Sequence, residues 1–171
     1  MVKALLLSLL LAAVALQATA AERPDFSGLW VPDPARSSTQ KELKGQTDSP
    51  APPPPPSAGE LPQLRIEHRE PKLAVSFLDS QGELLSSLAM TTDGVEAINE
   101  RGGGMVHRST TVWQGSALVT AWRLESSGTR LIGGTDTREL GDGLLTITGE
   151  VEDARSKSRT VTVYRLAPPP N

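Results

Sequence analysis

The stretch ALVTAWRLESSGTRLIGGTDTRELGDGLLTITGEVE, residues 117–152, decides the fold. Near its two ends, at 118–124 and 145–151, most alternate positions hold a large or apolar residue. A period of two indicates β-strands with one covered face. Ser127-Gly128 and Gly141-Asp142-Gly143 separate the segments, and such residues adopt the positive φ angles of tight hairpins. The stretch therefore predicts three antiparallel strands joined by two hairpins.

Proline and glycine divide the rest of the chain in the same way. None of the fourteen prolines lies between residues 72 and 167, and proline is excluded from central strands because it lacks a ladder donor. Glycines with turn-forming neighbours punctuate this stretch, a pattern typical of all-β sandwiches and barrels. The predicted strands are 26–31, 63–69, 72–79, 84–91, 95–99, 105–113, 117–124, 130–139, 144–151 and 158–166.

The connections between these segments are short after residue 60, so strands adjacent in sequence should be adjacent in space. We therefore predict an all-β fold, an antiparallel meander of about eight to ten strands that closes into a barrel, because closure removes exposed strand edges. Residues 21–171 would form this single domain.

The first twenty residues have the pattern of a secretory leader. A basic start is followed by an apolar run from residue 4 to 16 and by the small residues Ala18-Thr19-Ala20. The run is too short for a membrane span, and we predict cleavage between Ala20 and Ala21. A retained membrane anchor is the alternative; a lipoprotein anchor needs a cysteine, which the junction lacks. The mature chain would be periplasmic or secreted, with no membrane span.

Residues 37–60 break the strand pattern. They contain a single leucine and end in a polyproline tract, so they bury too little apolar surface to offset the entropy of ordering. We expect a disordered loop here. The alternative is a polyproline II ligand for an aromatic groove on a partner. Residues 167–171 are expected to form a frayed tail.

The composition excludes several classes of function. The chain has no cysteine, which removes disulfides, thiol catalysis and cysteine-based metal sites. Without the leader, 16 basic residues stand against 20 acidic ones, a net charge of −4. A mildly acidic surface argues against nucleic-acid binding, which needs clustered Lys and Arg.

The motifs at the two ends of the mature chain carry a resemblance. The segment DFSGLWVPDPARS, residues 25–37, and the closing segment RTVTVYRL, residues 159–166, resemble those of short secreted bacterial proteins that open on Ser-Gly-x-Trp and end in Tyr-Arg. More distantly, the pattern is similar to calycins, the class of lipocalins and fatty-acid-binding proteins. That resemblance implies a lipocalin-like barrel in which Gly28 allows close approach, and Trp30 plugs one end with Arg165 packed across it.

No pattern for catalysis or cofactor binding stands out. The two histidines, His68 and His107, lie far apart in sequence and form no metal-binding motif. The glycine run 102–104 precedes a β-segment, whereas a phosphate loop opens a helix, so a hairpin is expected. No Gly-x-Ser-x-Gly elbow occurs. We predict a protein that is not an enzyme and that holds neither metal nor cofactor.

Two functions remain. The first is binding of a small apolar or amphipathic ligand inside the barrel. The second is a solidly packed envelope protein that contacts other proteins through its loops. An apolar cavity of several hundred Å3 would favour the first function and a filled interior the second, since ligand pockets measure about 300–1,000 Å3. The candidate cavity residues are Phe77, Trp122 and Tyr164, with polar contacts from His68 or Arg108.

Overall fold

The computed structural model describes residues 23–43, 61–153 and 156–168. Its described residues contain antiparallel strands, one short 3-10 helix (η1, Pro34–Arg36) and no α-helix. The all-β prediction is thus confirmed. The strands are β1 (Gly28–Pro32), β2 (Ser38–Leu43), β3 (Gln63–Arg69), β4 (Lys72–Leu78), β5 (Leu84–Thr91), β6 (Ala97–Glu100), β7 (Met105–Gln114), β8 (Ala117–Ser126), β9 (Thr129–Gly141), β10 (Leu144–Glu152) and β11 (Ser156–Leu166).

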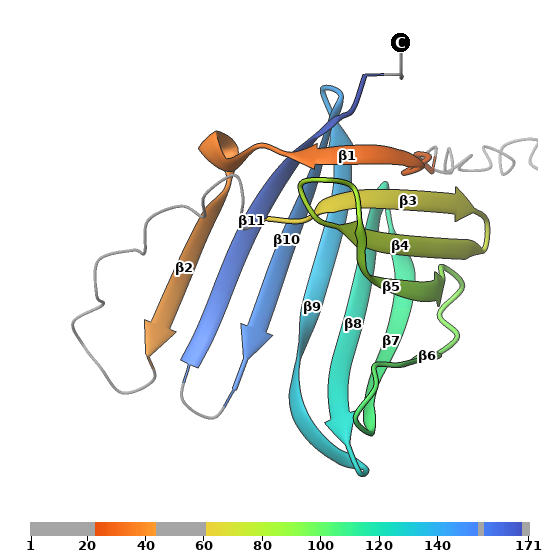
Figure 1. The fold of residues 1–171 in the computed structure, drawn as a ribbon, viewed down its shortest axis with the longest axis vertical. Coiled ribbons are helices and arrows are strands. Elements are labelled where there is room, and N and C mark those ends of the chain that lie inside the picture. Colours follow the sequence, from red (N-terminus) through yellow and green to blue (C-terminus); the bar gives the residue numbers. More distant parts are fainter. Residues whose placement is uncertain (1–22, 44–60, 154–155, 169–171) are drawn as a thin grey trace, which may run out of the picture.

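The strands form one sheet in the order β5-β4-β3-β1-β11-β10-β9-β8-β7-β6. Two antiparallel meanders, β3 to β5 and β6 to β11, are joined by β1, which pairs with β3 on one side and β11 on the other. In Figure 1 the sheet curls so that the short strands β3–β5 cross in front of the long strands β7 and β8. The hairpin turns predicted at residues 127–128 and 141–143 are present, with positive φ at Ser127 and Asp142.

The barrel is nearly closed, and its seam lies between β5 and β6. No ladder joins these two strands in the described sheet. Instead, the side-chain amide of Asn99 accepts a hydrogen bond from the Ala89 backbone N–H (2.8 Å) and donates one to the Ala89 carbonyl (2.9 Å). Beyond the seam, the Gly94 N–H donates to the Thr111 carbonyl. The Asn99 side chain thus takes the place of a backbone ladder between β5 and β6.

One prediction about the loop 37–60 is wrong. Residues Ser38–Leu43 form β2, which pairs with the first half of β11, whereas β1 pairs with its last residues. Figure 1 shows β2 lying along the lower part of β11. A polar strand is tolerated there because it lies at an edge, where the ladder needs only backbone groups. Residues 44–60 lie outside the described residues.

At the C-terminal end of the described residues, the Ala167 N–H donates to the Leu29 carbonyl, so the ladder continues one residue into the predicted tail.

The core fills the end of the barrel where β1 crosses it. Phe26 is fully buried and Trp30 is 4% exposed. The Trp30 indole N–H donates to the Phe26 carbonyl at 2.9 Å. A Cβ added to Gly28, whose φ is 145°, would lie 2.5 Å from Leu166 Cδ1. The structure thus places Trp30 in the core. At Gly28, the backbone lies close to the Leu166 side chain.

The predicted packing of Arg165 across Trp30 is wrong. Arg165 pairs with Val31, so it lies on the face of the sheet opposite to that of Trp30. Its side chain is 63% exposed and forms an ion pair with Asp33 at 3.4 Å. The tryptophan plug is therefore held by its apolar neighbours and by its own hydrogen bond.

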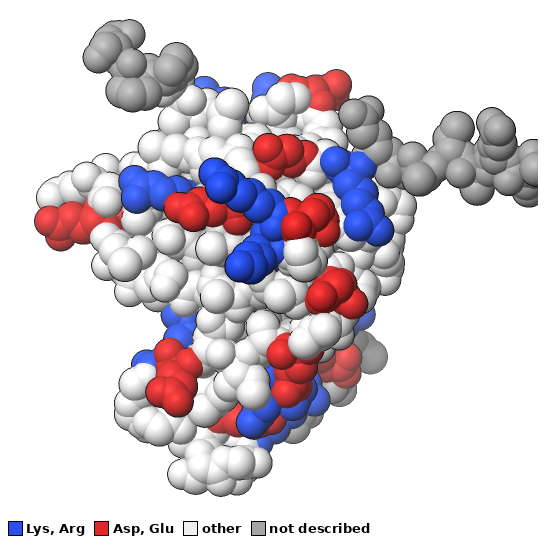
Figure 2. All heavy atoms as spheres, turned by 90° about the vertical axis from the view of Figure 1, so that its right-hand side faces the viewer, with Lys and Arg blue, Asp and Glu red and all other residues white. Residues whose placement is uncertain are grey.

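The outer surface carries charges of both signs. On the face shown in Figure 2, basic and acidic side chains are interspersed, and neither sign forms a continuous patch. Within the described ranges, no helix is both long and apolar enough to cross a membrane.

Candidate functional site

A cavity of about 510 Å3, open to solvent on one side, lies on the inner face of the sheet. Leu124 and Ile132 in its wall place it toward the end where β8 stops and β9 starts. Alternation along β7, β8 and β9 directs one set of side chains into it, while β4 and β5 supply the opposite wall. Most of the lining is apolar, and a histidine and two charged side chains complete it. The lining residues are Phe77, Leu88, Arg101, Met105, His107, Trp122, Leu124, Ile132 and Asp136.

Four buried polar atoms in this part of the barrel have no hydrogen-bond partner among the described residues. They are His107 Nδ1, Ser109 Oγ, Trp122 Nε1 and Arg138 Nε. His107 and Trp122 line the cavity, and Ser109 is the direct cross-strand partner of Trp122. Buried polar groups in proteins are almost always paired, and each exception calls for an explanation. A ligand that supplies the missing partners is one such explanation.

Among the described residues, Arg138 is the most deeply buried charge, with a side chain 4% exposed. Its Nη1 donates to Thr120 Oγ1 at 2.9 Å, and that hydroxyl in turn lies 2.9 Å from the Thr111 hydroxyl. Its partner charge is Asp136, with 3.7 Å between Nη2 and Oδ2. Burial lowers the pKa of Arg138 and Asp136 opposes that shift, and an arginine keeps its proton in such a setting.

Two further titratable groups of this interior, His107 and Tyr164, are neutral near pH 7. Burial lowers the pKa of His107, and the positive charge of Arg101 acts in the same direction. The His107 ring lies nearly parallel to that of Trp122, with an interplanar angle of 19° and 5.8 Å between the ring centroids. Burial raises the pKa of Tyr164 to about 12, so the phenol keeps its proton.

The structure brings two of the five predicted cavity residues to the cavity. Phe77 and Trp122 line it. Tyr164 is 5% exposed and belongs to the core cluster, close enough to Arg138 and Asp136 for their charges to act on its pKa. It is not among the residues that line the cavity.

The prediction that Arg108 faces the cavity is wrong. Arg108 lies on the outer face, where its guanidinium forms ion pairs with Glu96 at 2.9 Å and Glu125 at 3.0 Å. Arg123, directly opposite on β8, pairs with the same two glutamates. This four-residue cluster holds two strands together from outside and takes no part in the interior.

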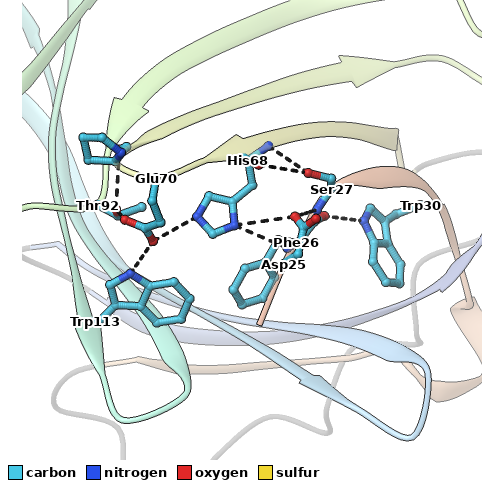
Figure 3. Close-up of polar contacts among 9 residues, drawn as sticks. Asp25, Phe26, Ser27, Trp30, His68, Glu70, Thr92 and Trp113 are labelled. Atoms are coloured by element: carbon cyan, nitrogen blue, oxygen red, sulfur yellow. Dashed lines mark hydrogen bonds and ion pairs between the residues drawn. The ribbon is translucent and has the colours of Figure 1, made fainter. Parts of the chain in front are cut away.

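His68 is buried, but it serves the opposite end of the barrel. Its Nδ1 accepts a long hydrogen bond (3.4 Å) from the Phe26 N–H, and its Nε2 lies 3.1 Å from Glu70 Oε1. Figure 3 shows the imidazole between Glu70 and the segment that precedes β1. The Ser27 hydroxyl bonds to the backbone N–H and carbonyl of His68 and not to its ring. The arrangement ties the chain to β3 and does not activate the serine.

Glu70 completes this hydrogen-bond network. It accepts bonds from the Trp113 indole at 2.7 Å and from the Thr92 hydroxyl at 2.5 Å. Burial acts to raise the pKa of Glu70, but the bonds from Thr92, Trp113 and His68 outweigh it, so the pKa is lower than usual. The ring of Trp113 also lies 5.9 Å from that of Phe26. The network in Figure 3 therefore connects the segment before β1 with β3, with β7 and with the loop after β5.

Sequence reasoning missed the polar residues of the interior. Ser109, Asp136 and Arg138 were not singled out, because polar residues in an alternating strand are expected to face solvent. The signal that could have found them is the alternation of β9, in which Ile132, Asp136 and Arg138 share one face.

Comparison with known proteins gives a likeness of fold. No family model matches the chain, and no curated protein matches its sequence. Among solved structures, it is similar to the REP1-NXSQ fatty acid transporter, with 14% identity, a TM-score of 0.48 and coverage of 83% of this chain and 96% of that one. It is also similar to the fluorescent protein UnaG, with 20% identity, a TM-score of 0.49 and coverage of 83% and 97%. Similarity at this level concerns the barrel alone.

Proposed function

We propose that this chain is an exported, non-catalytic barrel protein that binds a small amphipathic molecule in the interior cavity. The observation that carries the proposal is the pocket of about 510 Å3 with mostly apolar walls, which include His107 and Asp136; the unpaired polar atoms of His107, Ser109, Trp122 and Arg138 are buried in and behind these walls. Apolar pockets with a few convergent polar groups are the usual form of small-molecule sites.

The unpaired atoms favour a ligand over a void. An indole or guanidinium N–H left without a partner in a dry interior costs on the order of 1–3 kcal/mol. Water or a ligand oxygen removes that cost, and an apolar tail beside it gains about 25 cal/mol per Å2 of buried apolar surface. A molecule with both features fits this cavity better than water alone.

The cavity also supports this function over the packed envelope protein. A barrel that acts only through its loops needs a filled interior for stability. Here the core cluster fills the β1 end, whereas about 510 Å3 is open between Phe77, Leu88 and the β7–β9 wall. The proline-rich loop that would carry such contacts lies largely outside the described residues.

A pair of adjacent substitutions tests the proposal. Ile132 lines the cavity, whereas Leu131, next to it on β9, is 55% exposed. Titration of delipidated protein with the neutral fluorescent probe N-phenyl-1-naphthylamine should show saturable binding. The Ile132→Trp substitution should weaken that binding about tenfold or more by filling the site, while Leu131→Trp leaves it unchanged.

Thermal unfolding of both variants checks that they are folded. Absence of saturable binding to the wild-type protein would refute the proposal. Equal probe affinity in the wild type and a folded Ile132→Trp variant would place binding outside the cavity, which also refutes it.

A further inference from the structure

Phe77 belongs to the walls of two hollows in the barrel. One is the cavity described above, and the other is a second hollow of about 330 Å3, also open to solvent. The lining of this second hollow includes Leu61 and Pro62, which precede β3, and Leu85 and Ser86 of β5. Among the described residues, Phe77 is the one that both linings share.

The register of β4 and β5 places Phe77 at the boundary of the two hollows. Phe77 pairs with Leu64 of β3, which is 1% exposed, so both side chains lie on the inner face of the sheet. On β5, Ser86 lies directly opposite Phe77 and lines the second hollow. Leu88, two residues further along the same face of β5, lines the cavity. One hollow therefore ends and the other begins at Phe77.

A bulge in β5 shapes the second hollow. The register between β4 and β5 shifts after Phe77, so that Leu78 pairs with Leu84 and Leu85 has no partner on β4. Bulges redirect side chains, and Leu85, which is 62% exposed, lines the hollow together with its neighbour Ser86. The hollow is thus a consequence of how β4 and β5 pair beyond Phe77.

The apolar end of a ligand in the cavity would face Phe77. Phe77 and Leu88 are the lining residues that β4 and β5 supply, and both are apolar. The polar lining residues, Arg101, His107 and Asp136, come from β7, from β9 and from the turn before β7. An amphipathic molecule would therefore direct its head group toward those strands and its tail toward Phe77.

We propose that Phe77 sets the length of the apolar tail that the cavity accepts, because its side chain separates the cavity from the second hollow. This inference rests on the proposed function. A tail that fits ends at the Phe77 ring, and further methylene groups stay in water. Without the ring, the two hollows form one space, and a longer tail reaches the apolar side chains of Leu61, Pro62 and Leu85.

A series of 1-alkanols tests the inference. Alkanols from 1-hexanol to 1-dodecanol, in steps of a single carbon, share one uncharged head group, and displacement of N-phenyl-1-naphthylamine measures their affinities. In the wild-type protein the affinity should rise about fourfold per buried methylene and then level off. In Phe77→Ala it should rise for about two methylenes more, so that the alkanol two carbons beyond the wild-type limit binds about tenfold more tightly than it binds the wild type.

The Leu85→Trp substitution shows whether the longer tail enters the second hollow. Leu85 does not line the cavity, so this substitution alone should leave the wild-type series unchanged. Combined with Phe77→Ala, the tryptophan fills the second hollow, and the affinity should level off at the wild-type length again. A double variant that keeps the longer limit would overturn the inference.

The Phe77→Leu substitution decides the matter if Phe77→Ala does not fold. Leucine keeps an apolar contact with the core cluster and is shorter than the ring, so the limit should move by about one methylene. Thermal unfolding checks that each variant is folded. The inference is overturned, although the probe still binds, if folded Phe77 variants level off at the wild-type length or if the wild-type affinity rises steadily through 1-dodecanol. If neither the probe nor the alkanols bind the wild type, the proposed function fails first.

Discussion

Replacing Trp30 with alanine is expected to lower the free energy of unfolding by about 3–5 kcal/mol. The side chain is 4% exposed and lies in the core cluster beside Phe26 and Leu64. Its removal leaves a large void and also leaves the Phe26 carbonyl without the indole N–H that now donates to it. Urea unfolding followed by circular dichroism measures the change.

Two other variants separate the contributions. Trp30→Phe keeps most of the apolar volume but loses the hydrogen bond, and it should cost about 1–2 kcal/mol. Leu131→Ala, at a residue 55% exposed, should stay within about 0.5 kcal/mol of the wild type. A Trp30→Ala protein that unfolds at the wild-type urea concentration would show that this residue does not hold the barrel together.

The second large effect is expected at Gly134, in the middle of β9. An added Cβ would lie 2.2 Å from the Glu150 carbonyl oxygen of β10 and 3.2 Å from the Trp122 ring. The oxygen belongs to the backbone, so the strands themselves must separate to admit a methyl group. Gly134→Ala should therefore cost about 3 kcal/mol, at the upper end for overpacking, as measured by thermal and urea unfolding.

Gly141 provides the matched control, since it ends the same strand and nothing lies within 4 Å of an added Cβ. Gly141→Ala should change the stability by less than about 0.5 kcal/mol. Equal stabilities of the two alanine variants would mean that β9 and β10 do not approach each other as closely at Gly134 as the structure shows.

The strands could be predicted because two local signals agree. Period-two alternation and glycine turns mark the same boundaries, and the predicted segments 63–69 and 84–91 coincide with β3 and β5. Strand β2 was not predicted, because its polar residues show no alternation of apolar and polar side chains. The seam at Asn99 was not predicted either, because it depends on where two strands separated by a loop meet in space.

The faces of the strands were harder to predict than their existence. A shift of one residue moves every side chain to the opposite face. Arg108 was expected to contact a ligand in the cavity and Arg165 to pack across Trp30, but their cross-strand partners, Arg123 and Val31, put them on the outside. The polar interior could not be inferred from hydrophobicity, since Asp136 and Arg138 balance each other only once β9 is folded against its neighbours.

The three tryptophan indoles allow the most direct test of binding inside the barrel. In the structure, the Trp30 N–H donates to Phe26 and the Trp113 N–H to Glu70. The Trp122 N–H has no partner among the described residues, and the Trp122 side chain lines the cavity. Two-dimensional 1H–15N NMR of the protein, titrated with N-phenyl-1-naphthylamine, reports each indole N–H separately. We expect the Trp122 resonance to move with saturation while those of Trp30 and Trp113 stay in place. A probe that saturates the protein without moving the Trp122 resonance would contradict the account.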